Sequence, residues 1–220
     1  MVSKPKVILL DVNETLLDLT PLKQKINDLL GSDGFRSWFG LLLHYSLVDN
    51  STYSYHDFSA LGAATFDMAA TSLRKQVDPE KKKAALAQIQ SLPPHPDVEE
   101  GIKILKSKGV RLATLTNSPE KMSTAQLQFS GLIGHFEKTV SIDSIKLYKP
   151  GLQTYHWGAE QMGVDVADAM LIAAHGWDVA GALHAGMQAA FISRPGQSVY
   201  PLAPPPTLTG QDLVTIANQL

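Results

Sequence analysis

The chain contains no cysteine among its 220 residues. This absence excludes disulfides, thiolate zinc sites, iron–sulfur clusters and thiol nucleophiles, so any nucleophile must present oxygen or nitrogen. Charged residues are also few, at 18%, and the formal net charge is −2. We therefore expect no broad basic surface and no nucleic-acid partner. The first apolar run, residues 7–10, is interrupted by Asp11, which predicts neither a signal peptide nor a membrane span and favours a cytoplasmic protein.

Hydrophobic residues make up 44% of the chain, enough for one globular core carrying an insertion. Residues 7–10, Val-Ile-Leu-Leu, predict a strand that is buried on both faces and ends at Asp11. From residue 17 to residue 92 the apolar spacing is helical throughout. The expected helices run from Thr20 to Gly31, over 35–48, over 55–75, and from Asp78 to about Leu92.

A proline-rich connection at 93–96 precedes a regular alternation of strands and helices. The expected elements are a helix at 97–108, a strand at 110–115, a strand at 139–142, a helix at 151–162, a strand at 169–173, a helix at 177–186 and a strand at 188–193. This alternation predicts a parallel sheet. The fold class is therefore α/β, with a doubly wound, Rossmann-like parallel-sheet core formed by residues 1–16 and 93–220 and a helical cap inserted at 17–92. Ligands of such sheets bind beyond the carboxyl ends of the strands.

Polar residues follow four of the expected strands. They are Asp11 to Thr15, Thr116 to Ser118, Lys149-Pro150 and His175 to Asp178. A carboxylate at a strand end can attack an electrophile, an ammonium can neutralise nearby charge, and hydroxyl and amide groups can orient an anionic substrate. No motif is specific alone, since an Asp at a strand end is more commonly a helix-cap or turn residue than a nucleophile. Their common position after buried strands indicates that all four converge on one site.

These four segments resemble the loop motifs of the haloacid dehalogenase superfamily, whose helical cap lies where residues 17–92 lie here. Within that superfamily the chain is most similar to the L-2-haloacid dehalogenases. The residues that carry this similarity are Thr114 to Pro119, Tyr148 to Pro150, Tyr155, and Trp177-Asp178 followed by Gly181-Ala182. The resemblance covers almost the whole chain and implies a cofactor-free enzyme that forms a homodimer and has no membrane partner.

The resemblance also implies a two-step hydrolysis of a small (S)-2-haloalkanoic acid. Asp11 would displace the halide from carbon with inversion, and water would hydrolyse the aspartyl ester to release the D-2-hydroxy acid. Lys149 would stabilise Asp11, Asp178 would orient Lys149, and Tyr155 would wall the pocket. Trp177 would either wall the pocket with it or pack in the core. Catalytic roles are expected for Asp11, Thr15, Lys149, His175 and Asp178, and substrate binding for Asn13, Phe39, Thr116, Asn117, Tyr155 and Trp177.

Two positions favour carbon–halogen cleavage over phosphoryl transfer. Phosphatases of the superfamily carry a second Asp two residues after the nucleophile as general acid, and here Asn13 stands there. They also hold Mg²⁺ through a carboxylate four residues before the position of Asp178, and here that residue is Ala174. A halide leaves without protonation, so neither group is needed. We therefore expect no metal ligands.

Three positions depart from the dehalogenases. His175 stands where those enzymes usually carry Asn, and it is expected either to be structural or to act as general base for ester hydrolysis. Phe39 stands where they carry a cap Arg, one residue after a Trp, that helps to hold the halide. Glu14 replaces a common Gly and is expected to touch the cap or to be solvated.

Two other functions remain open at this stage. One is a Mg²⁺-dependent phosphatase of the same fold that acts on a small phosphoester through Asp11 and Asp178. The other is a catalytically silent protein that binds a small carboxylate or a partner protein. The sequence does not distinguish halogens or substrate chain lengths, because pocket volume depends on side chains that a linear pattern does not place.

Overall fold

The structure, a computed structural model, describes residues 4–220. The chain divides into two compact units, which are described separately. The core unit contains the described residues up to Asp18 together with Pro93–Leu220, and the helical unit contains Leu19–Leu92. Within residues 4–220 no helix has the length and apolar character needed to cross a bilayer.

The core unit is built on a six-stranded parallel sheet. The strands are β1 (Val7–Leu10), β2 (Arg111–Thr116), β3 (Lys138–Ser141), β4 (Ala169–Ala173), β5 (Gln188–Ile192) and β6 (Leu208–Gly210). Their order is β3-β2-β1-β4-β5-β6, with every neighbouring pair parallel. The predicted α/β, doubly wound fold class is confirmed. β6 was not predicted from the sequence, because it spans only three residues and follows a proline-rich stretch.

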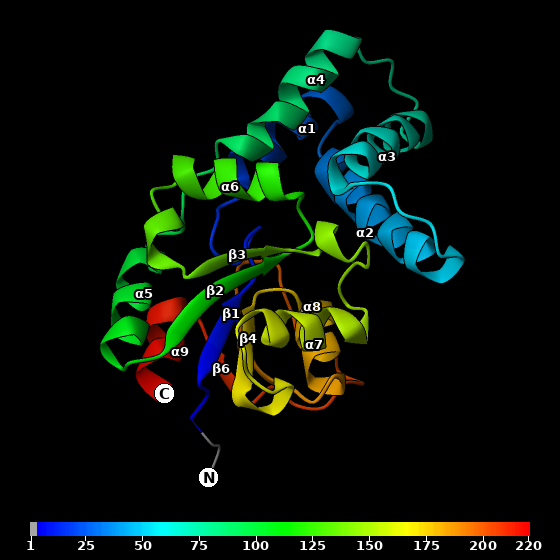
Figure 1. The fold of residues 1–220 in the computed structure, drawn as a ribbon. Coiled ribbons are helices and arrows are strands. Elements are labelled where there is room, and N and C mark those ends of the chain that lie inside the picture. Colours follow the sequence, from blue (N-terminus) through cyan, green and yellow to red (C-terminus); the bar gives the residue numbers. More distant parts are fainter. Residues whose placement is uncertain (1–3) are drawn as a thin grey trace. The chain divides into compact units, whose positions relative to one another are not determined.

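Helices cover both faces of this sheet. They are α5 (Val98–Ser107), α6 (Glu120–Phe129), α7 (Leu152–Gln161), α8 (Gly176–His184) and α9 (Leu213–Gln219), with short 3₁₀ turns η2 (Ile133–His135), η3 (Ile142–Ser144) and η4 (Val166–Asp168). Figure 1 shows α5 and α9 together against one face and α7 and α8 together against the other. The expected helices at 97–108, 151–162 and 177–186 are thus present. The sequence reasoning missed α6, whose Gln, Ser and Thr residues give a weak apolar pattern.

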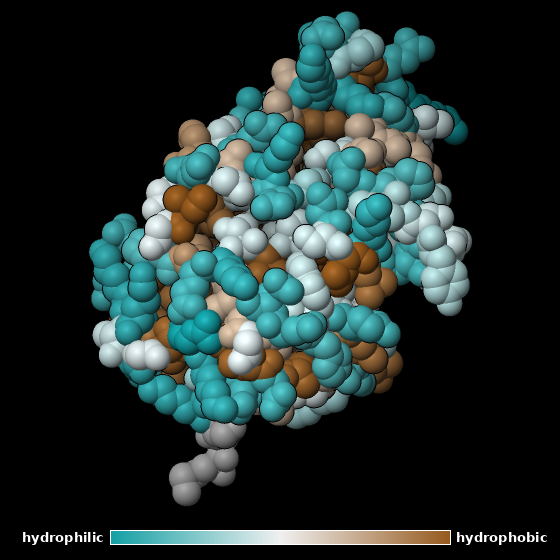
Figure 2. Space-filling view, viewed as in Figure 1, coloured by the Kyte–Doolittle hydropathy of each residue, from teal (hydrophilic) through white to brown (hydrophobic). Residues whose placement is uncertain are grey.

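The position of β1 and β4 in the middle of the sheet explains why their sequences are continuous apolar runs. Every residue of β1 and β4 is buried, since these strands lie in the middle of the sheet with helices on both sides. Hydrophilic side chains dominate the surface seen in Figure 2, and apolar ones appear there as small separate areas. The register places Leu10 beside Thr114 of β2 and Ile172 of β4. The carboxyl ends of β1, β2 and β4 therefore lie next to one another.

The helical unit consists of α1 (Thr20–Leu30), α2 (Gly34–Thr52), α3 (Phe58–Ser72), α4 (Pro79–Ala87) and the 3₁₀ turn η1 (Gln88–Gln90). Its helical character is as expected, although the helix predicted to reach Leu92 ends at Ala87. Asp57 and Asp78 cap α3 and α4 by accepting hydrogen bonds from backbone N–H groups. The function of this unit as a cap stays a prediction.

Two aromatic residues on α2 make contacts inside the helical unit. The indole N–H of Trp38 donates to the carbonyl of Gly62 at 2.8 Å and thereby joins α2 to α3. The ring of Phe39 is half-buried and stacks on the ring of Phe35, with centroids 5.5 Å apart. The contribution of Phe39 to substrate binding stays a prediction.

Candidate active site

Asp11 is the first residue after β1. Its backbone N–H donates to the carbonyl of Ile172 on β4 at 3.1 Å, which continues the sheet pattern and fixes the base of the side chain. Its Oδ1 accepts from Lys149 Nζ at 2.9 Å, and its Oδ2 accepts from Thr15 Oγ1 at 2.7 Å. Burial raises the pKa of Asp11, but the charges of Lys149 and His175 lower it by more than burial raises it. The pKa of Asp11 is therefore well below its usual value. The carboxylate is therefore ionised at neutral pH.

The ammonium of Lys149 lies between two carboxylates. The side chain is only 1% exposed, and Nζ donates to Asp11 Oδ1 at 2.9 Å, Asp178 Oδ2 at 2.6 Å and Leu115 O at 2.9 Å. Three acceptors match the three protons of an ammonium group. Burial lowers the pKa of Lys149, but Asp11 and Asp178 raise it above its usual value. The lysine is therefore a fixed positive charge beside Asp11.

Asp178, the second carboxylate beside Lys149, is held in turn by Tyr155. The Tyr155 hydroxyl donates to Asp178 Oδ1 at 2.6 Å, and both side chains are completely buried. Tyr155 therefore supports Asp178, and its part in a pocket wall stays a prediction. Burial raises the pKa of Asp178, and Lys149 opposes that rise. A Cβ at Gly181 would lie 2.5 Å from Tyr155 Oη, so glycine is needed for this contact.

The hydroxyl of Thr15 links the loop after β1 to the end of β4. Its oxygen accepts a hydrogen bond from the backbone N–H of Ala174 at 2.9 Å. The hydroxyl proton is then available to Asp11 Oδ2, 2.7 Å away. The side chain is completely buried. Thr15 therefore holds the carboxylate of Asp11 in one orientation.

His175 lies between the carboxylates of Asp11 and Glu14. Its Nδ1 is 3.5 Å from Asp11 Oδ2, its Nε2 is 3.0 Å from Glu14 Oε2, and its ring stacks on Trp177 with centroids 5.3 Å apart. Burial lowers the pKa of His175, but the hydrogen bonds and charges of Asp11 and Glu14 raise it to about 9. His175 is therefore an imidazolium at neutral pH while both carboxylates are charged.

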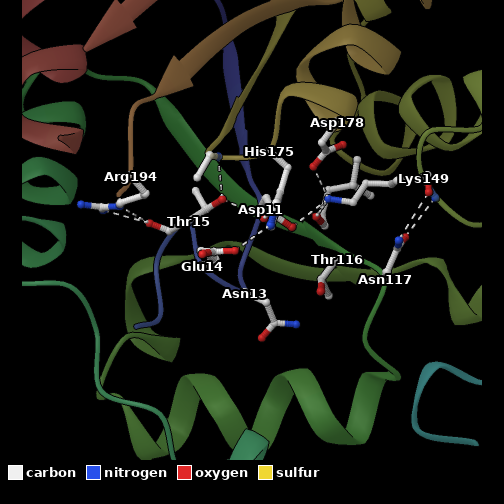
Figure 3. A network of polar contacts seen from close by, with 12 residues as sticks. Asp11, Asn13, Glu14, Thr15, Thr116, Asn117, Lys149, His175, Asp178 and Arg194 are labelled. Atoms are coloured by element: carbon white, nitrogen blue, oxygen red, sulfur yellow. Dashed lines mark hydrogen bonds and ion pairs between the residues drawn. The ribbon is translucent and has the colours of Figure 1, made fainter. Parts of the chain in front are cut away.

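The carboxylate of Glu14 is paired with His175 in the core unit, and the expectation that it touches the cap stays a prediction. Its backbone has φ 64°, a left-handed conformation that favours glycine and costs other residues about 1–2 kcal/mol. That conformation turns the carboxylate toward His175, as Figure 3 shows. The replacement of a common glycine was the one sequence signal that could have identified Glu14.

The remaining predicted polar residues are held by neighbours in the same unit. Asn13 donates through Nδ2 to Ser118 Oγ at 3.0 Å and accepts at Oδ1 from Gln126 Nε2 at 2.9 Å. Asn117 accepts at Oδ1 from the backbone N–H of Lys149 at 3.0 Å and donates to its carbonyl at 3.4 Å. Asn117 therefore positions Lys149 directly.

The hydroxyl of Thr116 stabilises the turn at the end of β2. Its Oγ1 accepts from the backbone N–H of Ser118 at 3.1 Å, which leaves the hydroxyl proton to donate elsewhere. Ser141 Oγ donates to the carbonyl of Ser118 at 2.7 Å and so anchors the loop that carries Thr116. All predicted site residues except Phe39 lie in the core unit, and most of them gather around Asp11 (Figure 3).

The donor set around Asp11 does not fit a magnesium site. The carboxylates of Asp11 and Asp178 already share the ammonium of Lys149, and that of Glu14 is paired with His175. Ala174 offers no side-chain ligand, and the Asn13 carbonyl oxygen accepts from Gln126. Among residues 4–220 there is no group of three or more His, Asp or Glu side chains that could hold a metal ion.

Known proteins share both the sequence pattern and the fold. The model of the family described as haloacid dehalogenase-like hydrolase matches residues 5–186. Haloacetate dehalogenase H-2 of Moraxella sp. (strain B) is 27% identical over 179 residues, covering 81% of this chain and 80% of that protein. The (S)-2-haloacid dehalogenase 4A of Burkholderia cepacia is 26% identical over 199 residues, covering 89% and 86%. A crystal structure of a dehalogenase has a TM-score of 0.91 and 25% identity, covering 100% of this chain and 99% of that one.

Proposed function

Since the chain belongs to the haloacid dehalogenase-like hydrolases, we propose that it hydrolyses the carbon–halogen bond of a small (S)-2-haloalkanoic acid. The relatives named above act on haloacetate and on (S)-2-haloacids, which supports this substrate class. The observation that carries the proposal is the ionised, buried carboxylate of Asp11, held by Lys149 and Thr15 and followed by Asn13 in place of a proton donor.

The first step forms an ester on Asp11. A carboxylate oxygen of Asp11 attacks the halogen-bearing carbon from the side opposite the halogen, and the halide leaves with the electron pair of the broken bond. No proton is transferred, so an amide at position 13 is sufficient. Back-side attack inverts the carbon and leads from the S acid to the D-2-hydroxy acid. The hydroxyl of Thr116 is a candidate donor to the substrate carboxylate.

Lys149 balances charge during this step. Before the reaction its ammonium is paired with Asp11 and Asp178. When Asp11 becomes a neutral ester, the ammonium keeps Asp178 as a partner and becomes free to attract the substrate carboxylate or the departing halide. Because Lys149 is held by its backbone as well as its side chain, this charge is already in position before the substrate binds.

The second step requires a base, and His175 with Glu14 supplies it in this proposal. His175 is an imidazolium in the free enzyme because two carboxylates flank it. Esterification removes the charge of Asp11, lowers the pKa of His175 and allows it to release its proton. The neutral imidazole then takes a proton from the water that attacks the ester carbonyl, while Glu14 stabilises the resulting imidazolium. The tetrahedral intermediate then expels the 2-hydroxy acid, whose oxygen takes the proton back from His175. The carboxyl group of Asp11, left protonated, returns its proton to the imidazole, so the net products are the hydroxy acid, the halide and the one proton that His175 gave to solvent after the first step.

Halide release tests the proposal. Chloroacetate and L-2-chloropropionate are supplied to the wild type, to Asp11→Asn and to a matched control, Asp168→Asn, whose carboxylate is exposed and precedes β4. We expect chloride release that is insensitive to a chelator, is lost in Asp11→Asn and is retained in the control. Release of phosphate from a small phosphoester that requires Mg²⁺, without halide release, would instead identify a phosphatase. A folded protein with neither activity, and with no mass increment on Asp11, would identify a binding protein.

A further inference from the structure

Arg194, two residues beyond the end of β5, is buried beside the loop that carries Asp11. Its side chain is only 6% exposed. Nε and Nη2 donate to the backbone carbonyl of Thr15 at 3.3 and 2.9 Å. Figure 3 shows the guanidinium on the side of this loop away from Lys149. The arginine therefore holds the backbone of the same residue whose hydroxyl contacts Asp11.

The guanidinium is itself fixed by Asp97. Nη1 donates to Asp97 Oδ1 at 2.7 Å and Nη2 donates to Asp97 Oδ2 at 3.0 Å, a two-point contact that restricts rotation. Asp97 Oδ2 also accepts from the backbone N–H of Leu213 at 2.7 Å. Asp97 immediately precedes α5, and Leu213 begins α9. Asp97 and Arg194, here called the clamp, thus tie the loop to α5 and α9, two helices that pack against each other.

A second contact holds the neighbouring peptide. His95 Nε2 lies 3.0 Å from the carbonyl of Glu14. Burial, followed by the charge of Arg194, lowers the pKa of His95, which favours the neutral imidazole that donates through Nε2. Two consecutive carbonyls, those of Glu14 and Thr15, are therefore bound by side chains. This arrangement fixes both peptide planes between Glu14 and the residue after Thr15.

We propose that Arg194, held by Asp97, is a positioning residue that sets the orientation of the Asp11 carboxylate through Thr15. The chain of contacts runs from Asp97 to Arg194, to the Thr15 carbonyl and, through the Thr15 hydroxyl, to Asp11 Oδ2. Arg194 touches no reacting atom, so its effect is on the geometry of attack. The expected effect on catalysis rests on the proposed function, in which Asp11 is the nucleophile.

Arg194→Met tests the clamp, because methionine preserves an apolar stem and removes the donors. Displacement of a reacting group by about 1 Å lowers a rate roughly 100-fold, so we expect kcat to fall 10- to 100-fold with KM within about twofold. Arg194→Lys, which keeps the charge and one donor group, is expected to recover part of the rate. The matched control is Arg111→Met. Arg111 makes the same kinds of contact, to a carboxylate and a backbone carbonyl, but at the amino end of β2.

A comparison with Thr15→Ala distinguishes an effect of Arg194 on the position of Asp11 from an effect on the stability of the protein. In a Thr15→Ala background, Arg194→Met is expected to lower kcat less than twofold, because the hydroxyl that transmits its effect is absent. Equal effects of Arg194→Met in both backgrounds would overturn the proposal, as would a fall in kcat in Arg111→Met as large as in Arg194→Met. If Arg194→Met does not fold, Asp97→Asn takes its place in the same comparison and is expected to have a smaller effect in the same direction.

A second readout keeps the clamp testable if the wild type releases no halide. The pKa of His175, followed by NMR titration, reports the proximity of Asp11 and Glu14 on the clamped loop. In Arg194→Met it is expected to fall from about 9, while Arg111→Met leaves it unchanged. An unchanged pKa in Arg194→Met would overturn the clamp alone. Missing halide release in the wild type would overturn the proposed function alone.

Discussion

Replacing Asp11 by asparagine is expected to lower the pKa of His175 to below about 8. Burial lowers this pKa, and hydrogen bonding and charge from Asp11 and Glu14 raise it from 6.5 to about 9. At about 1.4 kcal/mol per pKa unit, this rise means that the protein stabilises the imidazolium by about 3–4 kcal/mol relative to a free histidine. Asp11 contributes more than Glu14 to the attraction, and the cost of burial remains when Asp11 is neutral. Loss of its charge therefore removes more than half of the rise, or about 2 kcal/mol.

This prediction matters because an aspartyl ester is neutral in the same way as asparagine. The assay is an NMR titration of ring-labelled histidine, with the His175 signal assigned from its loss in His175→Gln. Glu14→Gln is expected to lower the pKa by a smaller amount. Asp168→Asn is the control, since that carboxylate precedes β4 while His175 follows it. A pKa of His175 near 6.5 in the wild type, or one that is unchanged in Asp11→Asn, would refute the proposed switch from imidazolium to base.

Four further predictions concern the same unit. Tyr155→Phe leaves Asp178 Oδ1 without its donor and is expected to lower the free energy of unfolding in urea by about 1–3 kcal/mol. Gly181→Ala places a Cβ 2.5 Å from Tyr155 Oη and is expected to cost a similar amount, about 1–3 kcal/mol, in the same assay. Asn13→Asp is expected to give no Mg²⁺-dependent phosphatase activity on p-nitrophenyl phosphate, because Ala174 still supplies no metal ligand. Finally, since the pKa of His175 is raised, its contribution to stability is complete below pH 6.5 and lost as pH rises through about 9, so His175→Gln should unfold with less pH dependence across that window.

The sheet and the charge cluster could be predicted because they depend on local pattern. The central strands β1 and β4 are continuous apolar runs, and a polar residue that follows such a strand must lie at the carboxyl edge of a parallel sheet. Asp11 after β1 and Asp178 near the end of β4 meet at Lys149 for this reason. The weakest elements, α6 and β6, were missed because a short or polar segment takes its structure from packing and not from its own pattern.

The contacts around the cluster could not be predicted, because they depend on backbone angles and on distant partners. Glu14 reaches His175 only because its φ is 64°. Arg194 is 179 positions from Thr15 and 97 from Asp97, and it belongs to no motif. Tyr155 was expected from the resemblance, but as part of the pocket wall. Its hydrogen bond to Asp178 becomes visible only when α7 packs against α8.

The most direct test of the account is a single turnover in H₂¹⁸O with enzyme in excess over L-2-chloropropionate. If Asp11 forms an ester that water cleaves at the carboxyl carbon, the lactate formed contains ordinary oxygen and the peptide that contains Asp11 gains one ¹⁸O, as measured by mass spectrometry. If water attacks the substrate directly, the hydroxyl of the lactate contains ¹⁸O and Asp11 remains unlabelled, which would contradict the account.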